Sequence, residues 1–178
     1  MSLIRFRPEN PERWRIAVID GPNMSNLGRR SKVTYGTIAS IHDLQQLVRE
    51  CAEELGVEVT PFVSNHEGEI LEFIHGSADD HNGYIINPAG LTTYGEATRH
   101  ALDETGKPVI ECHFSNTARH FDHAVQSYQN QFSRFTYSAT GLVMGMRQYS
   151  YVAALFGLVL SLDDAAFLDG GKYNHHER

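Results

Sequence analysis

Short, nearly continuous apolar runs alternate along this chain with segments of helical periodicity, and this alternation restricts the fold more than any other feature of the sequence. The apolar runs predict five strands, at residues 15–20, 57–63, 83–87, 108–112 and 141–144. Apolar residues at helical spacing predict helices at residues 38–55, 67–75, 93–104 and 151–162. Strands that are apolar on both faces are typical of parallel sheets covered by helices on each side. The sequence therefore predicts an α/β protein, a three-layer sandwich around a five-stranded parallel sheet.

Local signals predict where some of the helices begin and end. Ser40 begins a capping-box pattern for the first long helix, and Gly56 is expected to end that helix. Thr93 and Glu96 are expected to cap the helix that follows the third strand. The helix at residues 151–162 is apolar nearly all round, so we expect it to be buried or to lie at a contact between subunits.

Length, charge and cysteine content narrow the class of protein. The 178 residues suffice for one domain with a real core, residues 15–162, flanked by polar segments 1–14 and 163–178 that we expect to be loosely held. A formal net charge of −7 argues against a general nucleic-acid-binding protein, which needs a basic surface. No apolar run is long enough to cross a membrane, the first fourteen residues lack a secretory signal, and Cys51 and Cys112 are too few for a disulfide framework. We therefore expect a cytoplasmic globular protein with no nucleic-acid or membrane partner.

Polar side chains gather where the expected strands end. Ligands of open parallel sheets bind outside the carboxyl ends of the strands. The residues that follow these ends are Asn23, Arg30, Tyr35, Ser64–Glu67, Asn87, His113 and Ser115. We therefore expect a ligand site at this edge of the sheet.

Tyr35 is a candidate general base. It lies in an irregular loop close to Arg29, Arg30 and Lys32. A phenol ordinarily titrates near pH ~10, and neighbouring cations favour its ionised form. A single tyrosine in a basic loop is more often a surface aromatic residue, so the interpretation depends on the other groups at the same edge.

His113 is a candidate general acid. It follows a buried strand directly, and Glu111 precedes it by two positions on the same strand face. Imidazole is the commonest general acid and base in enzymes, and a carboxylate fixes its tautomer, although a histidine at the end of a strand is more often structural. Asn87 and Ser115 are suited to hold a substrate hydroxyl or a developing enolate. A phenolate base, an imidazole acid and such donors together favour an elimination next to a carbonyl.

The sequence gives no sign of a cofactor or metal. It contains neither the GxGxxG nor the GxxxxGK[ST] phosphate-binding pattern. His120 and His123 have helical spacing but no obvious carboxylate or thiolate companion. We expect neither cofactor nor metal.

Four motifs together resemble type II 3-dehydroquinate dehydratases. They occupy residues 19–36, 64–69, 85–88 and 111–116, in the order and spacing of that family, and the similarity covers about residues 15–160. The resemblance implies a flavodoxin-like fold, a homododecamer built as a tetramer of trimers, and no cofactor. It also implies a small hydroxylated ring compound as substrate, with elimination of water from 3-dehydroquinate through an enolate.

The resemblance also assigns roles by position. Tyr35 would remove the proton next to the ketone, while Arg30 would favour the ionised phenol and close a lid over the substrate. His113 would protonate the departing hydroxyl, with Glu111 orienting its ring. Asn23 would hold a water or the carbonyl at the enolate. Asn87 would hold the substrate or His113, and Ser115 would contact the region of the substrate carboxylate. The other expected substrate-binding residues are Asn116, Thr93, Arg119 and His100.

The chain departs from the family pattern at residues that bind the substrate's hydroxyl and carboxylate groups. Thr93 and Gly95 stand where the family usually has His and Ser, and His100 replaces an Asp contributed by a neighbouring subunit. Ala124 aligns with a substrate-binding Arg, whereas Arg119 fits the other Arg only after a shift of one residue. Loss of such groups changes substrate choice strongly. We therefore expect weak or no turnover of 3-dehydroquinate and a preference for a related hydroxylated ring compound. Either Arg119 or the backbone N–H groups at the start of the helix after Thr93 make up the lost contact, or the ligand lacks the carboxylate or carries bulk beside Gly95.

Two alternatives to a 3-dehydroquinate dehydratase follow from these departures. One is a dehydratase or isomerase of the same fold that acts on a different hydroxylated ring compound. The other is a non-catalytic, ligand-binding relative. A pure binding protein has no need of a paired base and acid, so the residues favour an enzyme.

Overall fold

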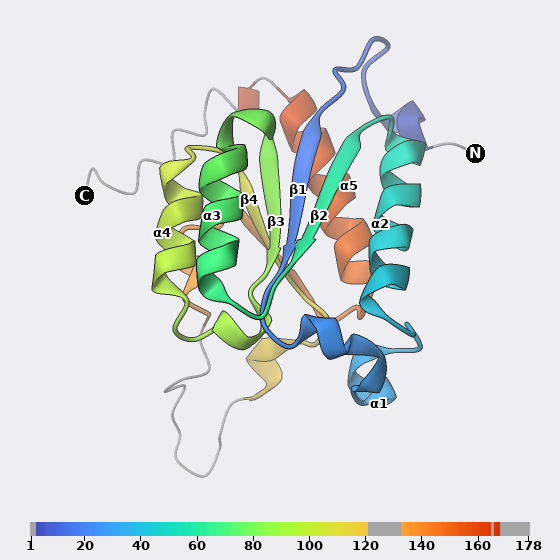
Figure 1. Ribbon diagram of the computed structural model, residues 1–178. Coiled ribbons are helices and arrows are strands. Elements are labelled where there is room, and N and C mark those ends of the chain that lie inside the picture. Colours follow the sequence, from blue (N-terminus) through green and yellow to red (C-terminus); the bar gives the residue numbers. More distant parts are fainter. Residues whose placement is uncertain (1–2, 121–132, 165, 168–178) are drawn as a thin grey trace.

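The computed structural model describes residues 3–120, 133–164 and 166–167, and its centre is a sheet of five parallel strands (Figure 1). The strands are β1 (Arg15–Asp20), β2 (Glu58–Val63), β3 (Gly83–Asn87), β4 (Val109–His113) and β5 (Gly141–Met144). Their order across the sheet is β2-β1-β3-β4-β5, and every neighbouring pair is parallel. This order is that of flavodoxin-like folds. The predicted fold is confirmed.

Helices cover both faces of the sheet. On one face lie α2 (Ile41–Leu55) and α5 (Tyr149–Asp163), and on the other lie α3 (Glu67–Ser77) and α4 (Glu96–Glu104) (Figure 1). Each face has its own apolar core, because the strands are apolar on both sides. Among the described residues, no helix is both long and apolar enough to cross a membrane.

Short helical segments occupy the connections. They are η1 (Leu3–Phe6), η2 (Met24–Arg29), α1 (Lys32–Tyr35), η3 (Ala78–Asp80), η4 (Ala89–Leu91), η5 (Thr117–His120) and η6 (Phe135–Tyr137). Both η2 and α1 lie in the basic loop after β1, which the sequence predicted to be irregular.

The predicted cap and end are confirmed for α2, whereas for α4 the predicted end at Glu104 is confirmed and the predicted start is wrong. The Ser40 hydroxyl accepts a hydrogen bond from the Asp43 backbone at 3.1 Å, and Gly56 ends the helix in the left-handed region at φ 71°. In contrast, α4 begins at Glu96, and its preceding residue is Gly95, which has no capping side chain. Thr93 does not cap this helix because its carbonyl lies in the preceding turn, where it accepts a hydrogen bond from Arg134.

The N-terminal segment is bound to the domain, so the expectation that it is loosely held is wrong for its described part. The buried Arg7 guanidinium donates to both oxygens of Asp163, at 2.7 and 2.8 Å, and to the Leu55 carbonyl at 2.9 Å. The Trp14 indole donates to the same carboxylate at 2.8 Å. Burial acts to raise the pKa of Asp163, but these hydrogen bonds outweigh it and hold the pKa below its ordinary value. Most of the expected C-terminal segment lies outside the described residues.

Candidate active site

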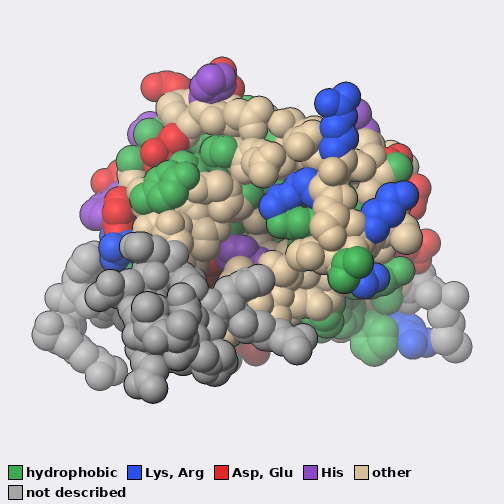
Figure 2. Space-filling model, turned by 90° about the horizontal axis from the view of Figure 1, so that it is seen from below, with side chains coloured by type: hydrophobic (Ala, Val, Ile, Leu, Met, Phe, Trp, Pro, Cys, Tyr) green, Lys and Arg blue, Asp and Glu red, His purple; other side chains and the backbone are tan. Residues whose placement is uncertain are grey.

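A cavity of about 240 Å³ opens at the carboxyl ends of β1, β3 and β4, the lower edge of the sheet in Figure 1. It is lined by Pro22, Asn23, Met24, Arg30, Tyr35, Asn87, Ala89, Gly90, Thr92, His113, Phe114, Ser115 and Thr117. Figure 2 views this end of the molecule and shows Lys and Arg side chains gathered on its right-hand part, on the side of α1. Six of the residues predicted from the strand ends thus share one cavity.

Arg30 and Tyr35 form the first pair of functional groups. One guanidinium nitrogen of Arg30 donates a hydrogen bond to the Tyr35 hydroxyl, and the guanidinium carbon lies 3.7 Å from the centre of the phenol ring. The ring also lies 5.9 Å from that of Phe114, which holds it against the end of β4. Arg29 and Lys32, the other cations of the loop, are exposed. Arg30 is therefore the cation that faces charge on the phenol oxygen.

His113 and Glu111 form the second pair. Both are buried at the end of β4, and Nε2 of His113 lies 2.6 Å from Oε1 of Glu111. The second carboxyl oxygen accepts a hydrogen bond from Thr136, and Ser133 contributes another. Burial acts to raise the pKa of Glu111, but the hydrogen bonds and His113 outweigh it and hold the pKa below its ordinary value. Glu111 is therefore a carboxylate.

Sequence reasoning missed Thr136 and Ser133. They lie in and just before η6, more than twenty positions after Glu111 and outside every motif of the site. Neither the type nor the spacing of these residues distinguishes them from surface hydroxyls, so the sequence held no signal for their contact with Glu111.

Asn23 reaches the cavity from a strained position, and the motif after β2 supports it. Asn23 has a φ of 75°, in the left-handed region that asparagine tolerates better than most residues. Its backbone N–H donates to the Asn65 side chain at 2.7 Å, and Asn65 in turn donates to Ser25 at 3.0 Å. The Ser64–Glu67 segment therefore does not line the cavity but positions a residue that does.

Asn87, Tyr151 and Asp20 form a buried chain of hydrogen bonds behind the cavity. The Asn87 amide nitrogen donates to the Tyr151 hydroxyl at 2.7 Å, and this hydroxyl donates to the Asp20 carboxyl. Burial raises the pKa of Asp20 to about 7, and the hydrogen bond from Tyr151 opposes that rise. Burial and the neighbouring Asp20 raise the pKa of Tyr151 well above its ordinary value. Sequence reasoning placed Asn87 at the site but missed the two groups behind it.

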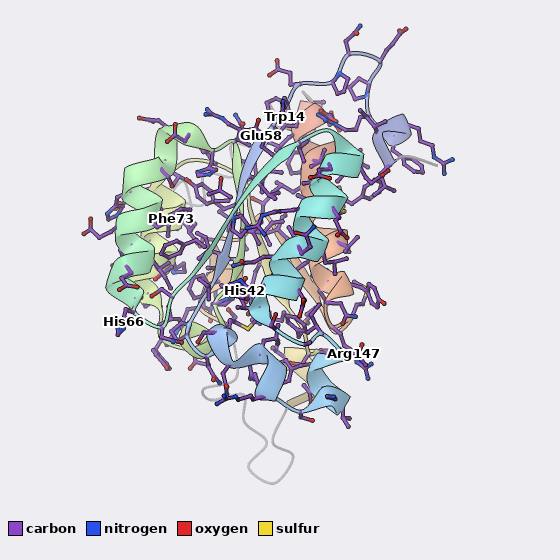
Figure 3. The ribbon with its side chains drawn as sticks, turned by 45° about the vertical axis from the view of Figure 1, so that its right-hand side comes forward. Trp14, His42, Glu58, His66, Phe73 and Arg147 are labelled. Carbon is purple, nitrogen blue, oxygen red and sulfur yellow. The ribbon has the colours of Figure 1, made fainter. Side chains whose placement is uncertain are left out.

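Arg147 contacts the loop that carries the candidate base. Its guanidinium donates to the Val33 carbonyl at 3.0 Å, between Arg30 and Tyr35 in the sequence (Figure 3). Arg147 adopts a φ of 55°, which is unusual for a residue with a side chain. The contact joins the β5–α5 connection to residues 24–35, which we call the lid segment.

Three of the predicted substrate-binding residues do not line the cavity. Thr92 lines it in place of Thr93. The His100 side chain is 64 % exposed on α4, beside Glu96. Asn116 accepts a hydrogen bond from the backbone of Ala118 in the turn after β4. His123 and Ala124 lie outside the described residues, and the side chain of Arg119 is likewise not described.

The predicted space beside Gly95 does not exist. A Cβ atom built on Gly95 would lie 2.8 Å from Cβ of Leu91 and 3.0 Å from the ring of Phe135. Both side chains are buried. The proposal that a ligand fills this position is therefore wrong, because the protein's own side chains already occupy it.

Comparison with known proteins decides the family. The family model described as "Dehydroquinase class II" matches residues 14–159. The chain belongs to the class II dehydroquinase family. Among curated dehydroquinase relatives, the 3-dehydroquinate dehydratase of Halothermothrix orenii is 40% identical over 145 residues, which cover 82% of this chain and 93% of the relative. That of Bacillus cereus is 35% identical over 151 residues, which cover 85% and 99% of the two chains.

A solved dehydroquinase structure agrees with the fold. The type II dehydroquinase of Butyrivibrio crossotus superimposes with a TM-score of 0.74 at 30% identity, covering 82% of this chain and 97% of that one. The resemblance stated from the four motifs is confirmed, and with it the expectation of a dehydroquinase-like hydro-lyase.

Proposed function

We propose that this dehydroquinase eliminates water from a cyclic β-hydroxy ketone, and that 3-dehydroquinate, the compound named in its relatives, is the substrate. The observation that carries the proposal is that one cavity is lined by both Tyr35, paired with Arg30, and His113, paired with Glu111. A base and an acid that face one small space suit the removal of a proton and a hydroxyl from neighbouring carbon atoms.

The first step is removal of the proton next to the ketone. The ionised Tyr35 oxygen takes this proton, and the electron pair of the broken C–H bond moves into an enolate. Before the transfer, the Arg30 guanidinium faces the negative phenol oxygen, to which it donates a hydrogen bond. Asn23 lines the same cavity and is assigned to hold the enolate oxygen, directly or through a water.

The second step is loss of the hydroxyl. The enolate electron pair forms the carbon–carbon double bond as the C–O bond breaks, and the departing oxygen takes a proton from His113. The Glu111 carboxylate, 2.6 Å from Nε2, orients the His113 ring that supplies this proton. The proton held by Tyr35 then returns through solvent to His113, so the enzyme is restored and the net products are an enone and water.

Ultraviolet detection of the enone formed from 3-dehydroquinate tests the proposal. A kcat/KM within the range of about 10⁴–10⁸ M⁻¹s⁻¹ common to enzymes would support 3-dehydroquinate as the substrate and show that the substitutions at Thr93, Gly95 and Ala124 are compensated. Weak turnover, as those substitutions lead us to expect, would favour the second candidate substrate. His113→Gln should lower kcat by about 10²- to 10⁴-fold. The control is His42→Gln, at an exposed position on α2, which should leave kcat unchanged (Figure 3). Equal rates for the two variants would contradict the role of His113.

A related ring compound is the second candidate substrate, and the positions of Thr93 and His100 favour it. Neither side chain lines the cavity. Within the described residues, Thr93 and His100 therefore do not take over the substrate contacts of the family residues that they replace. Enone formation from a related cyclic hydroxy-ketone at a higher kcat/KM than from 3-dehydroquinate would establish this second candidate.

We also infer that the chain forms a trimer-based dodecamer, as the family resemblance implies. Large apolar side chains remain exposed in the single chain, including Tyr94, Tyr137 and Leu142. Such side chains are typical of surfaces that another subunit covers. Light scattering should give a mass far above the 20.0 kDa of one chain, and a monomer at micromolar concentration would contradict the inference.

A further inference from the structure

The Asn87 side chain has almost all of its hydrogen-bonding capacity occupied by the protein. Its amide nitrogen donates to the Tyr151 oxygen at 2.7 Å and to the Met24 sulfur at 3.3 Å. Its amide oxygen accepts a hydrogen bond from the Ala89 backbone at 3.1 Å. An amide group has two hydrogens to donate and two lone pairs on its oxygen. The capacity left for a ligand in the cavity is therefore one lone pair of the Asn87 oxygen.

This orientation of the amide is enforced from two sides. Turning the group over would place its nitrogen against the Ala89 N–H, so that two donors would face each other. It would also place the amide oxygen against the Tyr151 oxygen, whose hydrogen is already donated to Asp20. Asp20 thus determines which way the Tyr151 hydroxyl points, and Tyr151 determines which way the amide points.

The fold brings these groups together from three elements. Asp20 and Asn87 are register partners at the ends of the neighbouring strands β1 and β3, and Tyr151 reaches them from α5. None of the three is more than 4% exposed. A buried carboxyl group with a raised pKa destabilises a fold at neutral pH, so its presence directly behind a cavity residue calls for a role.

We propose that Asp20 and Tyr151 are positioning residues that lock Asn87 with its amide oxygen as the acceptor for a substrate hydroxyl. The proposal rests on the proposed function and adds to it the kind of group that the ligand presents at this wall of the cavity, a hydrogen-bond donor. A ligand that presents an acceptor there, such as an ether or carbonyl oxygen, is disfavoured because it would face the lone pair of the amide oxygen.

Tyr151→Phe tests the lock, and Tyr84→Phe is its matched control. Both tyrosines are fully buried, but the Tyr84 hydroxyl has no hydrogen-bond partner among the described residues, so its loss breaks no hydrogen bond within them. Loss of the Tyr151 hydroxyl leaves an amide hydrogen of Asn87 without its partner. We expect Tyr151→Phe to lower kcat/KM for 3-dehydroquinate by about tenfold to a hundredfold, the effect of one unsatisfied buried group. Tyr84→Phe should leave kcat/KM unchanged.

Hydrogen exchange of the Asn87 side-chain amide gives a readout that needs no turnover. Its signal is identified in a protein labelled with ¹⁵N at asparagine, by its absence in Asn87→Asp. We expect slow exchange in the wild type and in Tyr84→Phe, and faster exchange in Tyr151→Phe. Unchanged exchange in Tyr151→Phe would overturn the proposal. If the wild type fails to dehydrate 3-dehydroquinate, the substrate assignment fails, and the exchange comparison still decides the proposed lock.

Two variants of Asp20 separate positioning from simple packing. Asp20→Asn keeps an oxygen that accepts the Tyr151 hydrogen, whereas Asp20→Leu keeps the branched arrangement of heavy atoms without an acceptor. We expect Asp20→Asn to keep slower Asn87 amide exchange and higher kcat/KM than Asp20→Leu. Equal values in the two variants would overturn the role of Asp20.

Discussion

Replacing Asp20 by Asn should stabilise the protein increasingly as the pH rises from 5 to 8. Burial raises the pKa of Asp20 in the folded protein from 3.8 to about 7. The folded state therefore binds a proton that the unfolded chain has lost over this interval. The contribution of protonated Asp20 to stability is fully present below the pKa that Asp20 has in the unfolded chain. It is lost as the pH rises through the pKa that Asp20 has in the folded protein. Asparagine does not titrate, so the variant escapes this loss.

The size of the effect follows from the two pKa values. One pKa unit corresponds to about 1.4 kcal/mol, so the separation between 3.8 and about 7 destabilises the fold by about 4 kcal/mol at high pH. Integration over the measurable interval from pH 5 to pH 8 gives about 3 kcal/mol of this loss. The expected result is that the difference in free energy of unfolding between Asp20→Asn and the wild type increases by about 3 kcal/mol from pH 5 to pH 8, in favour of the variant.

Urea unfolding of both proteins at pH 5 and pH 8 measures this difference. Protein concentration is kept fixed, because assembly contributes to apparent stability. Asp79→Asn is the control, because it makes the same chemical change at an exposed position. An equal difference between wild type and Asp20→Asn at pH 5 and pH 8 would refute the claim that burial raises the pKa of Asp20.

Three further substitutions test contacts elsewhere. Arg7→Met leaves the Asp163 carboxylate without its cation and should lower the free energy of unfolding by about 3 kcal/mol in urea, and a loss below about 1 kcal/mol would contradict a buried ion pair. Arg147→Gly places glycine at a left-handed backbone position and should raise the free energy of unfolding by about 1 kcal/mol. The same change should raise KM, because the Val33 carbonyl loses the hydrogen bond from the Arg147 guanidinium. An unchanged KM would contradict a role for this contact. Gly95→Ser should destabilise the protein by about 1–3 kcal/mol through overpacking, and a neutral effect in thermal unfolding would disprove the close approach.

Much of the fold could be predicted from local sequence because the strands are short apolar runs with clear ends. Strands β1, β3 and β5 match their predicted residues, and the others are displaced by one residue at one or both ends. Prediction of α4 failed at its start because Thr93 and Glu96 match a capping pattern, whereas the chain makes another turn first. The helix propensities of neighbouring residues give no sign of this extra turn. It is stabilised by a hydrogen bond from Arg134, which is distant in the sequence, to the Thr93 carbonyl.

The candidate site was also predictable only in part. Tyr35, His113 and Asn87 were predictable because strand ends in a parallel sheet meet at one edge. The groups that orient them were not, because Thr136 and Tyr151 come from distant segments and their partners are set only by packing. The role of Arg7 was missed for the same reason, since a polar N-terminal segment gives no sign of the carboxylate that it meets.

The central claim is that Tyr35 is the base of an elimination, and the enone assay on Tyr35→Phe tests it most directly. The matched control is Tyr149→Phe, which removes a hydroxyl from an exposed tyrosine outside the cavity. On whichever cyclic β-hydroxy ketone the wild type dehydrates best, we expect kcat of Tyr35→Phe to fall by about 10²- to 10⁴-fold. The control should keep the wild-type rate. A Tyr35→Phe enzyme whose kcat stays within twofold of its Tyr149→Phe counterpart would contradict the account.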